Sequence, residues 1–220
     1  MRPVRSRVAL RVWDGATVWA SLRKGSEPLD AAAIGKIGPL LEQARADGVL
    51  CDAWYDHGDS PEWSWRAERV VLALRDRDAL GGVLERLGAA GFADVRVSLE
   101  GEVRPCAIAS SASARARFTR QEPGRFGDVE LHLAPLAAGR ELVIAAAPEL
   151  DAELVAFFDG VVDGVSWAAS RGPEPGRPVI AGTVTWAGGR FHPVDSARAA
   201  YRVAAARAFL EAIARPGVVD

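Results

Sequence analysis

The chain has 220 residues, a formal net charge of −2 and a hydrophobic content of 49%, which allows one large or two small globular domains. The balanced charge excludes a protein that is basic over its whole surface, although a local basic end is compatible with it. No apolar run approaches the ~20 residues needed to cross a bilayer, and the charged residues 1–10 do not read as a signal peptide. We therefore expect a cytoplasmic protein without a membrane-spanning segment.

In the first part of the chain, two runs of alternating apolar and polar residues predict β-strands. They cover residues 7–13 and 16–22 and flank Asp14 and Gly15. An Asp-Gly pair between two such runs is a strong signal for a tight hairpin turn. We therefore expect these two strands to pair with each other.

Helical and extended patterns alternate in the residues that follow. The predicted elements are a helix over 29–47, strands over 49–55 and 69–74, a helix over 78–90 and a strand over 92–99. Gly35, Gly38 and Pro39 lower the helical propensity of the first helix and favour a break in it. Asp78 lies where it would cap the second helix. The β-α-β-β-α-β order predicts a ferredoxin-like split-βαβ domain over residues 1–104.

Residues 105–220 predict a second domain. The small polar segment 107–114 is expected to be a linker or an edge segment. The predicted elements after it are strands over 115–120, 129–133 and 141–146, a helix over 150–170, a strand over 179–186 and a helix over 196–215. A turn is expected over 187–189, and Asp195 or Ser196 lies where a helix N-cap belongs. The element order is therefore β-β-β-α-β-α.

Several motifs in this second half have a fixed order. Residues 172–179 read G-P-E-P-G-R-P-V, a strand follows, and residues 191–196 then read F-H-P-V-D-S before an Ala-rich amphipathic helix. Upstream lie G-R-F-G-D-V at 124–129 and F-D-G-V at 158–161. In this order and spacing, the region from about 105 to 215 resembles domain IV of elongation factor G.

The resemblance implies a particular fold. It implies an α+β two-layer domain of the ribosomal protein S5 domain 2-like type, with β-β-β-α-β-α order and a left-handed β-α-β crossover. Parallel crossovers are right-handed in about 98% of cases, so the pattern of elements alone would predict the other hand. A ferredoxin-like domain followed by domain IV is also the order of domains III and IV in elongation factor G.

The resemblance also implies a site. In that family the H-x-V-D-S loop and the loop before the first F/Y strand meet at one end of domain IV, which enters the decoding centre of the ribosome. Arg198 and Arg202 lie one helical turn apart beside this end, and a helix N-terminus adds partial positive charge. The candidate RNA-binding residues are Arg120, Gln121, Arg125, Arg190, His192, Arg198 and Arg202. In the first loop, Glu122-Pro123 departs from the Gly-rich stretch of the family.

A second candidate is a polar, Trp-rich loop in the N-terminal half. Its candidate residues are Asp56, His57, Asp59, Glu62, Trp63 and Trp65. Its acids and histidine are types that bind a divalent cation, but the spacing fits no calcium-loop pattern. The tryptophans would also suit a stacking platform or a partner-binding patch. The alternative is a solvated hairpin loop whose tryptophans fold back on the sheet.

Several enzyme signatures are missing from the sequence. There is no G-x-x-x-x-G-K-[ST] phosphate loop, and His57, His132 and His192 have no partner at metal-ligand spacing. We therefore expect no GTP binding, no metal and no cofactor. The favoured interpretation is a non-enzymatic RNA- or ribosome-associated module. The alternatives are a small-molecule enzyme on the same second-domain fold, or a protein-interaction module that uses the Trp-rich half. Oligomeric state and the redox state of Cys51 and Cys106 stay open.

Overall fold

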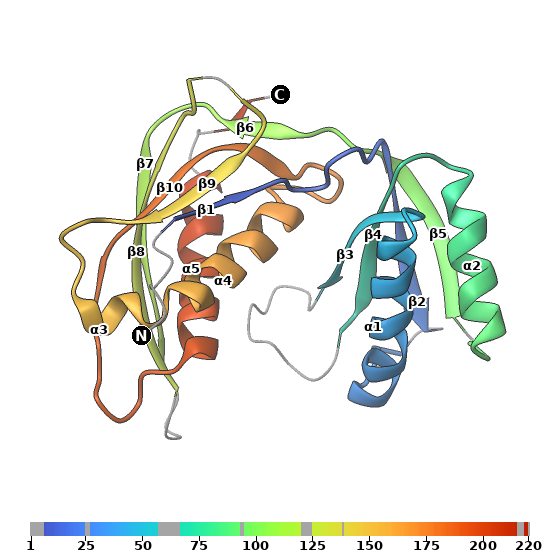
Figure 1. Cartoon of the computed structure of the whole chain (residues 1–220), viewed down its shortest axis with the longest axis horizontal. Coiled ribbons are helices and arrows are strands. Elements are labelled where there is room, and N and C mark those ends of the chain that lie inside the picture. The colour runs from blue at the N-terminus through green and yellow to red at the C-terminus, as the bar shows by residue number, and fades with distance from the viewer. Residues whose placement is uncertain are drawn as a thin grey trace. The chain divides into compact units, whose positions relative to one another are not determined.

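A computed structural model describes residues 7–24, 27–56, 67–92, 95–119, 125–137, 139–214 and 218–219 (Figure 1). The chain divides into two compact units. One is Trp13–Arg104, and the other combines Met1–Val12 with Pro105–Asp220. Among the described residues, no helix combines the length and the apolar character that a membrane crossing requires.

The unit Trp13–Arg104 has a four-stranded antiparallel sheet and two helices. Its elements are β2 (Val18–Lys24), α1 (Ala31–Ala46), β3 (Leu50–Asp56), β4 (Arg69–Leu74), α2 (Ala79–Ala89) and β5 (Val95–Glu102). The strands lie in the order β3-β4-β2-β5, and the neighbouring pairs are antiparallel. This is the ferredoxin-like split-βαβ topology that the sequence pattern predicts.

One apolar core holds both helices of this unit against one face of the sheet. Ile37 and Leu41 of α1 and Val83 and Leu87 of α2 are buried in it together with Leu22 of β2. Every second residue of a strand points to the same face of the sheet, and helix residues three or four apart lie on the same side of the helix. The apolar face of the sheet therefore packs against the apolar sides of the two helices. The burial of these side chains fixes which face of each element is covered.

The N-termini of α1 and α2 and the interior of α1 differ in detail from the prediction. Helix α1 runs without a break through Pro39, because the buried residues on either side of the proline hold both halves of the helix against the core. The side chain of Asp30 caps α1 by accepting the Ala33 N–H at 2.8 Å. At α2 the capping oxygen comes from Asp76, which accepts the Ala79 N–H at 2.9 Å, whereas Asp78 makes no side-chain cap bond.

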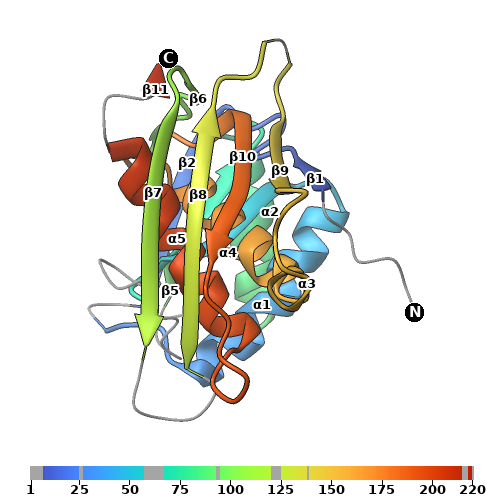
Figure 2. The same ribbon diagram turned by 90° about the vertical axis from the view of Figure 1, so that its left-hand side faces the viewer.

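The second unit is built on a larger mixed sheet. Its elements are β1 (Arg7–Leu10), β6 (Cys106–Ile108), β7 (Ala112–Thr119), β8 (Phe126–Ala134), β9 (Leu142–Ala146), α3 (Ala152–Val155), α4 (Phe158–Arg171), β10 (Val179–Gly189), α5 (Arg198–Ala214) and β11 (Val218–Val219). Strands β7, β8, β10, β9 and β1 lie side by side in this order, with α4 and α5 behind them in Figure 2. Strand β6 pairs with the first residues of β10, and β11 pairs with β6.

The connection from β9 through α4 to β10 is left-handed. The two strands are parallel neighbours. In Figure 2, β8 points upward, so the antiparallel β10 and its parallel neighbour β9 both point downward, and β10 lies to the left of β9 with α4 behind the sheet. This arrangement is the rare hand of a parallel crossover. The fold that the family resemblance implies is therefore confirmed.

The predicted N-terminal hairpin is wrong. The chain does turn at Asp14 and Gly15, where the Ala16 N–H donates to the Trp13 carbonyl at 3.0 Å. However, β1 pairs antiparallel with β9 of the other sheet, while β2 pairs with β4 and β5. Each run therefore finds its partner in a different sheet, and the turn joins the two sheets. A local turn signal describes the backbone bend but not the strand partners.

Other boundaries shift by a few residues. The segment 107–114, predicted as a linker or an edge segment, contains most of β6 and the first residues of β7. The helix predicted over 150–170 is divided into α3 and α4, and β10 continues through the predicted turn at 187–189. That continuation pairs Gly188 and Gly189 with β8, so two glycines that predict a turn instead extend the strand.

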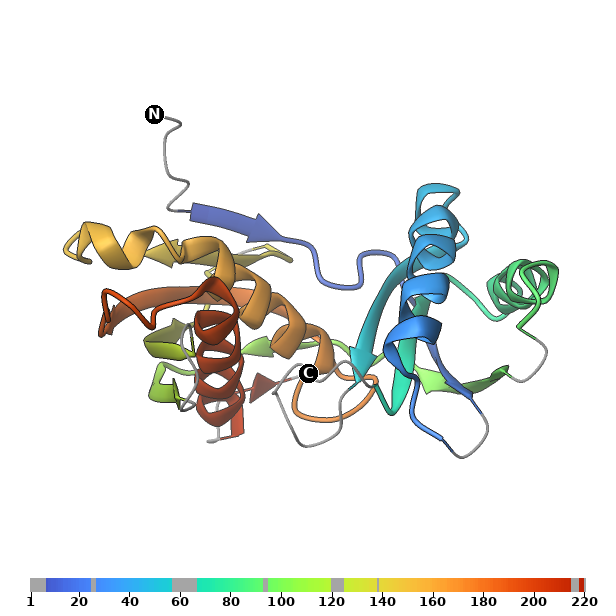
Figure 3. The ribbon, with the colours of Figure 1, turned by 90° about the horizontal axis from the view of Figure 1, so that it is seen from below.

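Helix α5 packs unusually closely on its neighbours at three glycines. A side chain at Gly160 or Gly164 of α4 would meet the backbone carbonyl of Arg198 or Arg202, and one at Gly127 of β8 would meet the backbone of α5. Helices α4 and α5 lie side by side in Figures 2 and 3. The absence of a Cβ at these positions sets the distance between α5 and the rest of the unit.

We expect Gly164→Ala to lower the free energy of unfolding by about 1–3 kcal/mol, because the new methyl group forces α4 and α5 apart. The measurement is urea unfolding followed by circular dichroism. The control is Gly81→Ala in α2, where nothing lies within 4 Å of the added atom. That change should raise the stability by about 0.5–1 kcal/mol through helix propensity. A stabilising effect at Gly164 would show that the two helices separate easily.

Candidate functional site

The loop between β10 and α5, residues 190–197, is here called the tip loop. It is closed by its own hydrogen bonds. The His192 N–H donates to Ser196 Oγ at 2.9 Å, the Ser196 N–H donates to the His192 carbonyl at 3.1 Å, and the Asp195 N–H donates to His192 Nδ1 at 3.1 Å. Asp195 and Ser196 of the motif therefore hold the histidine in one position.

The predicted capping role of Asp195 or Ser196 is wrong, because α5 begins at Arg198 and Ala197 is the residue before it. The Ser196 hydroxyl accepts from His192 inside the loop, and the first backbone bonds of α5 run to the carbonyl of Ala197, which accepts from Ala200 at 2.9 Å and from Tyr201 at 3.1 Å. A polar residue just before a helix satisfies whichever N–H group lies within reach. Here that group is the N–H of His192.

The start of β8 lies against the tip loop. The Phe126 N–H donates to the Asp195 carbonyl at 2.8 Å, and Phe126 forms a parallel bridge with Ser196. The rings of Phe126 and His192 are 6.0 Å apart between centroids. The two segments that the family resemblance brings together, the F/Y strand start and the H-x-V-D-S loop, are therefore neighbours in the structure.

A row of aromatic rings joins the core of this unit to the tip loop. Trp186 and Tyr201, both fully buried, meet edge to face at 5.7 Å, and Tyr201 stacks on Phe157 at 4.6 Å. Phe157 in turn lies 6.1 Å from Phe191 of the loop. We call Trp186, Tyr201, Phe157 and Phe191 the aromatic row. These successive ring contacts extend from the sheet to the exposed end of the domain.

The same buried rings also hold the backbone that leads into the loop. Trp186 Nε1–H donates to the Gly188 carbonyl at 2.8 Å, and the Tyr201 hydroxyl donates to the Arg190 carbonyl at 2.7 Å. Burial raises the pKa of Tyr201, which keeps this hydroxyl protonated and able to donate. Sequence reasoning missed these roles, because an aromatic residue at strand or helix spacing looks like ordinary core.

The exposed surface of the tip loop is mixed. Val194 is 73% exposed and Phe191 is 40% exposed, and the His192 side chain is 49% exposed, with Nδ1 3.1 Å from Asp195 Oδ2. Arg190 at the loop start is exposed. Apolar and imidazole surfaces beside an arginine suit contacts with bases and phosphates.

The two predicted arginines of α5 differ from each other. The Arg198 side chain is 62% exposed and its Nη2 donates to Asp163 Oδ2 of α4 at 2.7 Å. This hydrogen bond raises the pKa of Arg198. Arg202 is half-buried, and this burial lowers its pKa to about 10. The more accessible guanidinium at the start of α5 is therefore that of Arg198.

Several predicted site residues lie outside the described residues. In the tip region these are Arg120 and Gln121, and in the Trp-rich loop they are His57, Asp59, Glu62, Trp63 and Trp65. Arg125, just before β8, is described and exposed. Asp56 ends β3 as a buried carboxylate that accepts from Arg69 Nε at 2.8 Å. Within the described part of the chain, no three His, Cys, Asp or Glu residues gather as metal ligands would.

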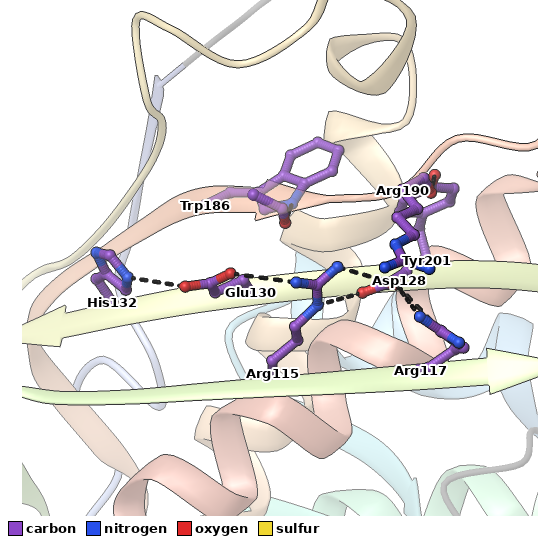
Figure 4. Close-up of polar contacts among 9 residues, drawn as sticks. Arg115, Arg117, Asp128, Glu130, His132, Trp186, Arg190 and Tyr201 are labelled. Atoms are coloured by element: carbon purple, nitrogen blue, oxygen red, sulfur yellow. Dashed lines mark hydrogen bonds and ion pairs between the residues drawn. The ribbon is translucent and has the colours of Figure 1, made fainter.

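A chain of charged groups lies on the sheet face opposite α5. Its members are Arg115 and Arg117 of β7 and Asp128, Glu130 and His132 of β8, which we call the charge cluster (Figure 4). Both guanidiniums bind the one carboxylate of Asp128, Arg115 Nε at 2.8 Å from Oδ1 and Arg117 Nη2 at 3.0 Å from Oδ2. Glu130 lies 3.7 Å from Arg115 and 3.4 Å from His132. Sequence reasoning missed this cluster, although R-A-R and D-V-E-L-H both alternate at strand spacing.

Asp128 is the centre of that cluster. Its side chain is 0% exposed, and burial by itself raises the pKa of a carboxyl group. The hydrogen bonds from Arg115 and Arg117 outweigh this effect and hold the pKa of Asp128 below its usual value. The carboxylate is therefore ionised at neutral pH and orients both arginines.

The fold and the tip loop define this chain as a translation-factor-like module. A family model described as elongation factor G, domain IV, matches residues 102–216. Because that match covers more than half of the chain, the chain belongs to this family.

A solved structure with a similar chain comes from the organism Thermus thermophilus. It is 22% identical in sequence and superposes with a TM-score of 0.45, over 93% of this chain and 29% of that one. The present chain therefore spans less than a third of the length of that protein.

We expect Asp128→Asn to lower the free energy of unfolding by about 1–3 kcal/mol at pH 7, because two charge-assisted hydrogen bonds lose their charged acceptor. The folded-state pKa of Asp128 is depressed, so this stabilisation is complete above the unfolded value of about 3.9 and is lost as pH falls through the folded value. Urea unfolding of both proteins from pH 7 to acid should show the difference shrinking only below about pH 4. A constant difference at all pH values would contradict the assignment.

Proposed function

We propose that this chain is a non-enzymatic module that binds RNA or the ribosome through the tip loop. The observation that supports it best is the closed loop of residues 190–197, which presents His192, Phe191 and Val194 at the exposed end of an elongation factor G domain IV fold. A preorganised loop binds with little loss of conformational entropy. Its mixture of rings and positive charge matches the chemistry of single-stranded or looped RNA.

In this proposal the side chains have separate roles. Arg190, Arg125 and Arg198 contact phosphates, which position the RNA. His192 and Phe191 stack on bases or pack against sugars. We propose that Arg120 and Gln121, which lie outside the described residues, also contact the RNA. Arg202 is half-buried, so its main contribution to the site is its packing within the helix layer.

The family supports a proposal for the partner class. We propose the ribosome, or a structured RNA, as the partner and the cytoplasm as the compartment where the two meet. In this proposal the module binds without a nucleotide, and the sequence contains no phosphate-binding loop of the G-x-x-x-x-G-K-[ST] type.

We expect His192→Ala and Phe191→Ala each to weaken binding to purified ribosomal subunits by about 1–3 kcal/mol, because stacking on a base is lost. Arg190→Gln should weaken binding and reduce the slope of log affinity against log salt by about 0.7–0.9, the value of one phosphate. The measurement is sedimentation binding at several salt concentrations.

The control for these variants is Leu84→Ala, which removes a side chain of similar exposure, 43% against 40% for Phe191, in the other unit. It should bind like the wild type. Unchanged binding by all three tip variants, with wild-type binding intact, would move the contact surface away from the tip loop. An absence of wild-type binding to ribosomes and to RNA would contradict the proposed function as a whole.

We also expect no heat of binding when GTP or ATP is titrated into the protein by calorimetry up to millimolar concentration. The physical reason is that the Gly-rich backbone cradle with a lysine, which binds nucleotide phosphates in P-loop proteins, is not present in the sequence. Binding in the micromolar range would favour the alternative of a small-molecule enzyme on the same fold.

A further inference from the structure

The charge cluster lies next to the tip loop but on a different surface, the open face of the sheet. Strand β10 pairs with β8 as far as Gly189, opposite Val129, and Arg190 follows at once as the first residue of the tip loop. Asp128 is the neighbour of Val129, and Arg117 lies opposite Asp128 in the register of β7 and β8. The cluster therefore lies beside the first residue of the tip loop.

Within the cluster, the triad of Arg115, Arg117 and Asp128 presents its guanidinium groups to the surroundings. The side chains of Arg115 and Arg117 are 44% and 48% exposed, whereas the carboxylate between them is fully buried. Two guanidiniums and one carboxylate leave one positive charge in this triad, and the carboxylate of Glu130 lies beside Arg115. Each arginine uses Nε and Nη2 on Asp128, so Arg117 Nη1 points away from that carboxylate and Arg115 Nη1 lies 3.7 Å from Glu130.

On β10, two neighbouring positions of the sheet surface near the arginines have no side chain. Across β8 from Arg115 and Glu130, strand β10 places Gly188, and its next residue towards the loop is Gly189. Neither has a side chain that rises above the sheet. A polymer backbone can therefore approach the sheet closely here, with the arginines on one flank.

From these observations we propose that the RNA-binding surface continues from the tip loop onto the face of β7 and β8, where Arg115 and Arg117 contact the phosphates of one strand. This inference rests on the proposed function of the tip loop. The guanidinium groups select the ligand, because charged N–H donors held in a fixed orientation match phosphate oxygens. Asp128 is a positioning residue that keeps both guanidiniums facing outward.

The test is fluorescence anisotropy with a labelled single-stranded RNA oligonucleotide, titrated between about 50 and 200 mM salt. We expect Arg115→Gln and Arg117→Gln each to lower affinity by about threefold to tenfold and the salt slope by about 0.7, the value for one phosphate of a single strand. Arg117→Lys should restore most of the slope, since it restores the charge. Arg140→Gln is the matched control, because it removes an exposed arginine from the loop between β8 and β9 and should change neither quantity.

The outcomes separate this inference from the proposed function. If Phe191→Ala weakens binding but Arg115→Gln and Arg117→Gln behave like Arg140→Gln, the tip loop binds RNA and the sheet face does not, which overturns this inference alone. If wild-type protein does not bind the RNA or ribosomes, both fail. If inorganic phosphate displaces the RNA as well as unlabelled RNA does at equal phosphate concentration, the arginines bind a small anion and the inference of an RNA strand is overturned.

A single arginine change leaves part of the charge of Asp128 uncompensated and could unfold the protein. The double variant Arg117→Gln, Asp128→Asn avoids this problem, because it replaces the ion pair by two neutral amides and leaves the net charge of the chain unchanged. We expect it to show the same loss of salt slope with a native circular dichroism spectrum. A folded double variant with wild-type affinity and slope would contradict the proposal.

Discussion

The close approach of α5 to α4 and β8 is the constraint on which the rest of the second unit depends. It is possible only because Gly127, Gly160 and Gly164 have no Cβ where the backbone of α5 passes. The first turn of α5 follows directly from the tip loop, so the height of this helix above the sheet sets the position of the loop. Glycine lowers helix propensity by about 1 kcal/mol relative to alanine. The packing of α4 against α5 offsets this loss.

The aromatic row extends this constraint to the surface. Trp186 comes from the central strand and Tyr201 from α5, so the contact between them depends on the distance that the glycines allow. Both side chains then hold carbonyl groups of the segment that enters the loop, at Gly188 and Arg190. An exposed loop that is tied to buried rings loses little conformational entropy when it binds. The core therefore restricts the conformations of the exposed loop, although no core side chain belongs to the loop surface.

Much of the fold was predictable from the sequence, because strong periodic patterns and a motif series cover both units. The ferredoxin-like order and the β-β-β-α-β-α order with its left-handed crossover both hold, and the latter came from the family resemblance rather than from periodicity. The hairpin at Asp14 and Gly15 was wrong, because local turn chemistry does not specify which sheet a strand joins. The continuous α1 shows the same limit, since buried Ile37 and Leu41 outweigh the local effect of Pro39.

The candidate site was predictable only in part, and the residues of β8 show why. Its residues alternate between two faces, with Val129 and Leu131 buried towards α5 and Asp128 and Glu130 on the opposite face. Hydrophobic spacing identifies the covered face, but it leaves the opposite face looking like ordinary solvated surface. The charge cluster arises only when the register of β7 places Arg117 opposite Asp128 and Arg115 opposite Glu130. A shift of one residue in that register would turn both arginines towards α5. The apolar residues that fix the register, among them Phe118 and Ala114, thus also determine where the arginines lie, and the same strand pairing that builds the core arranges the charged face beside the tip loop.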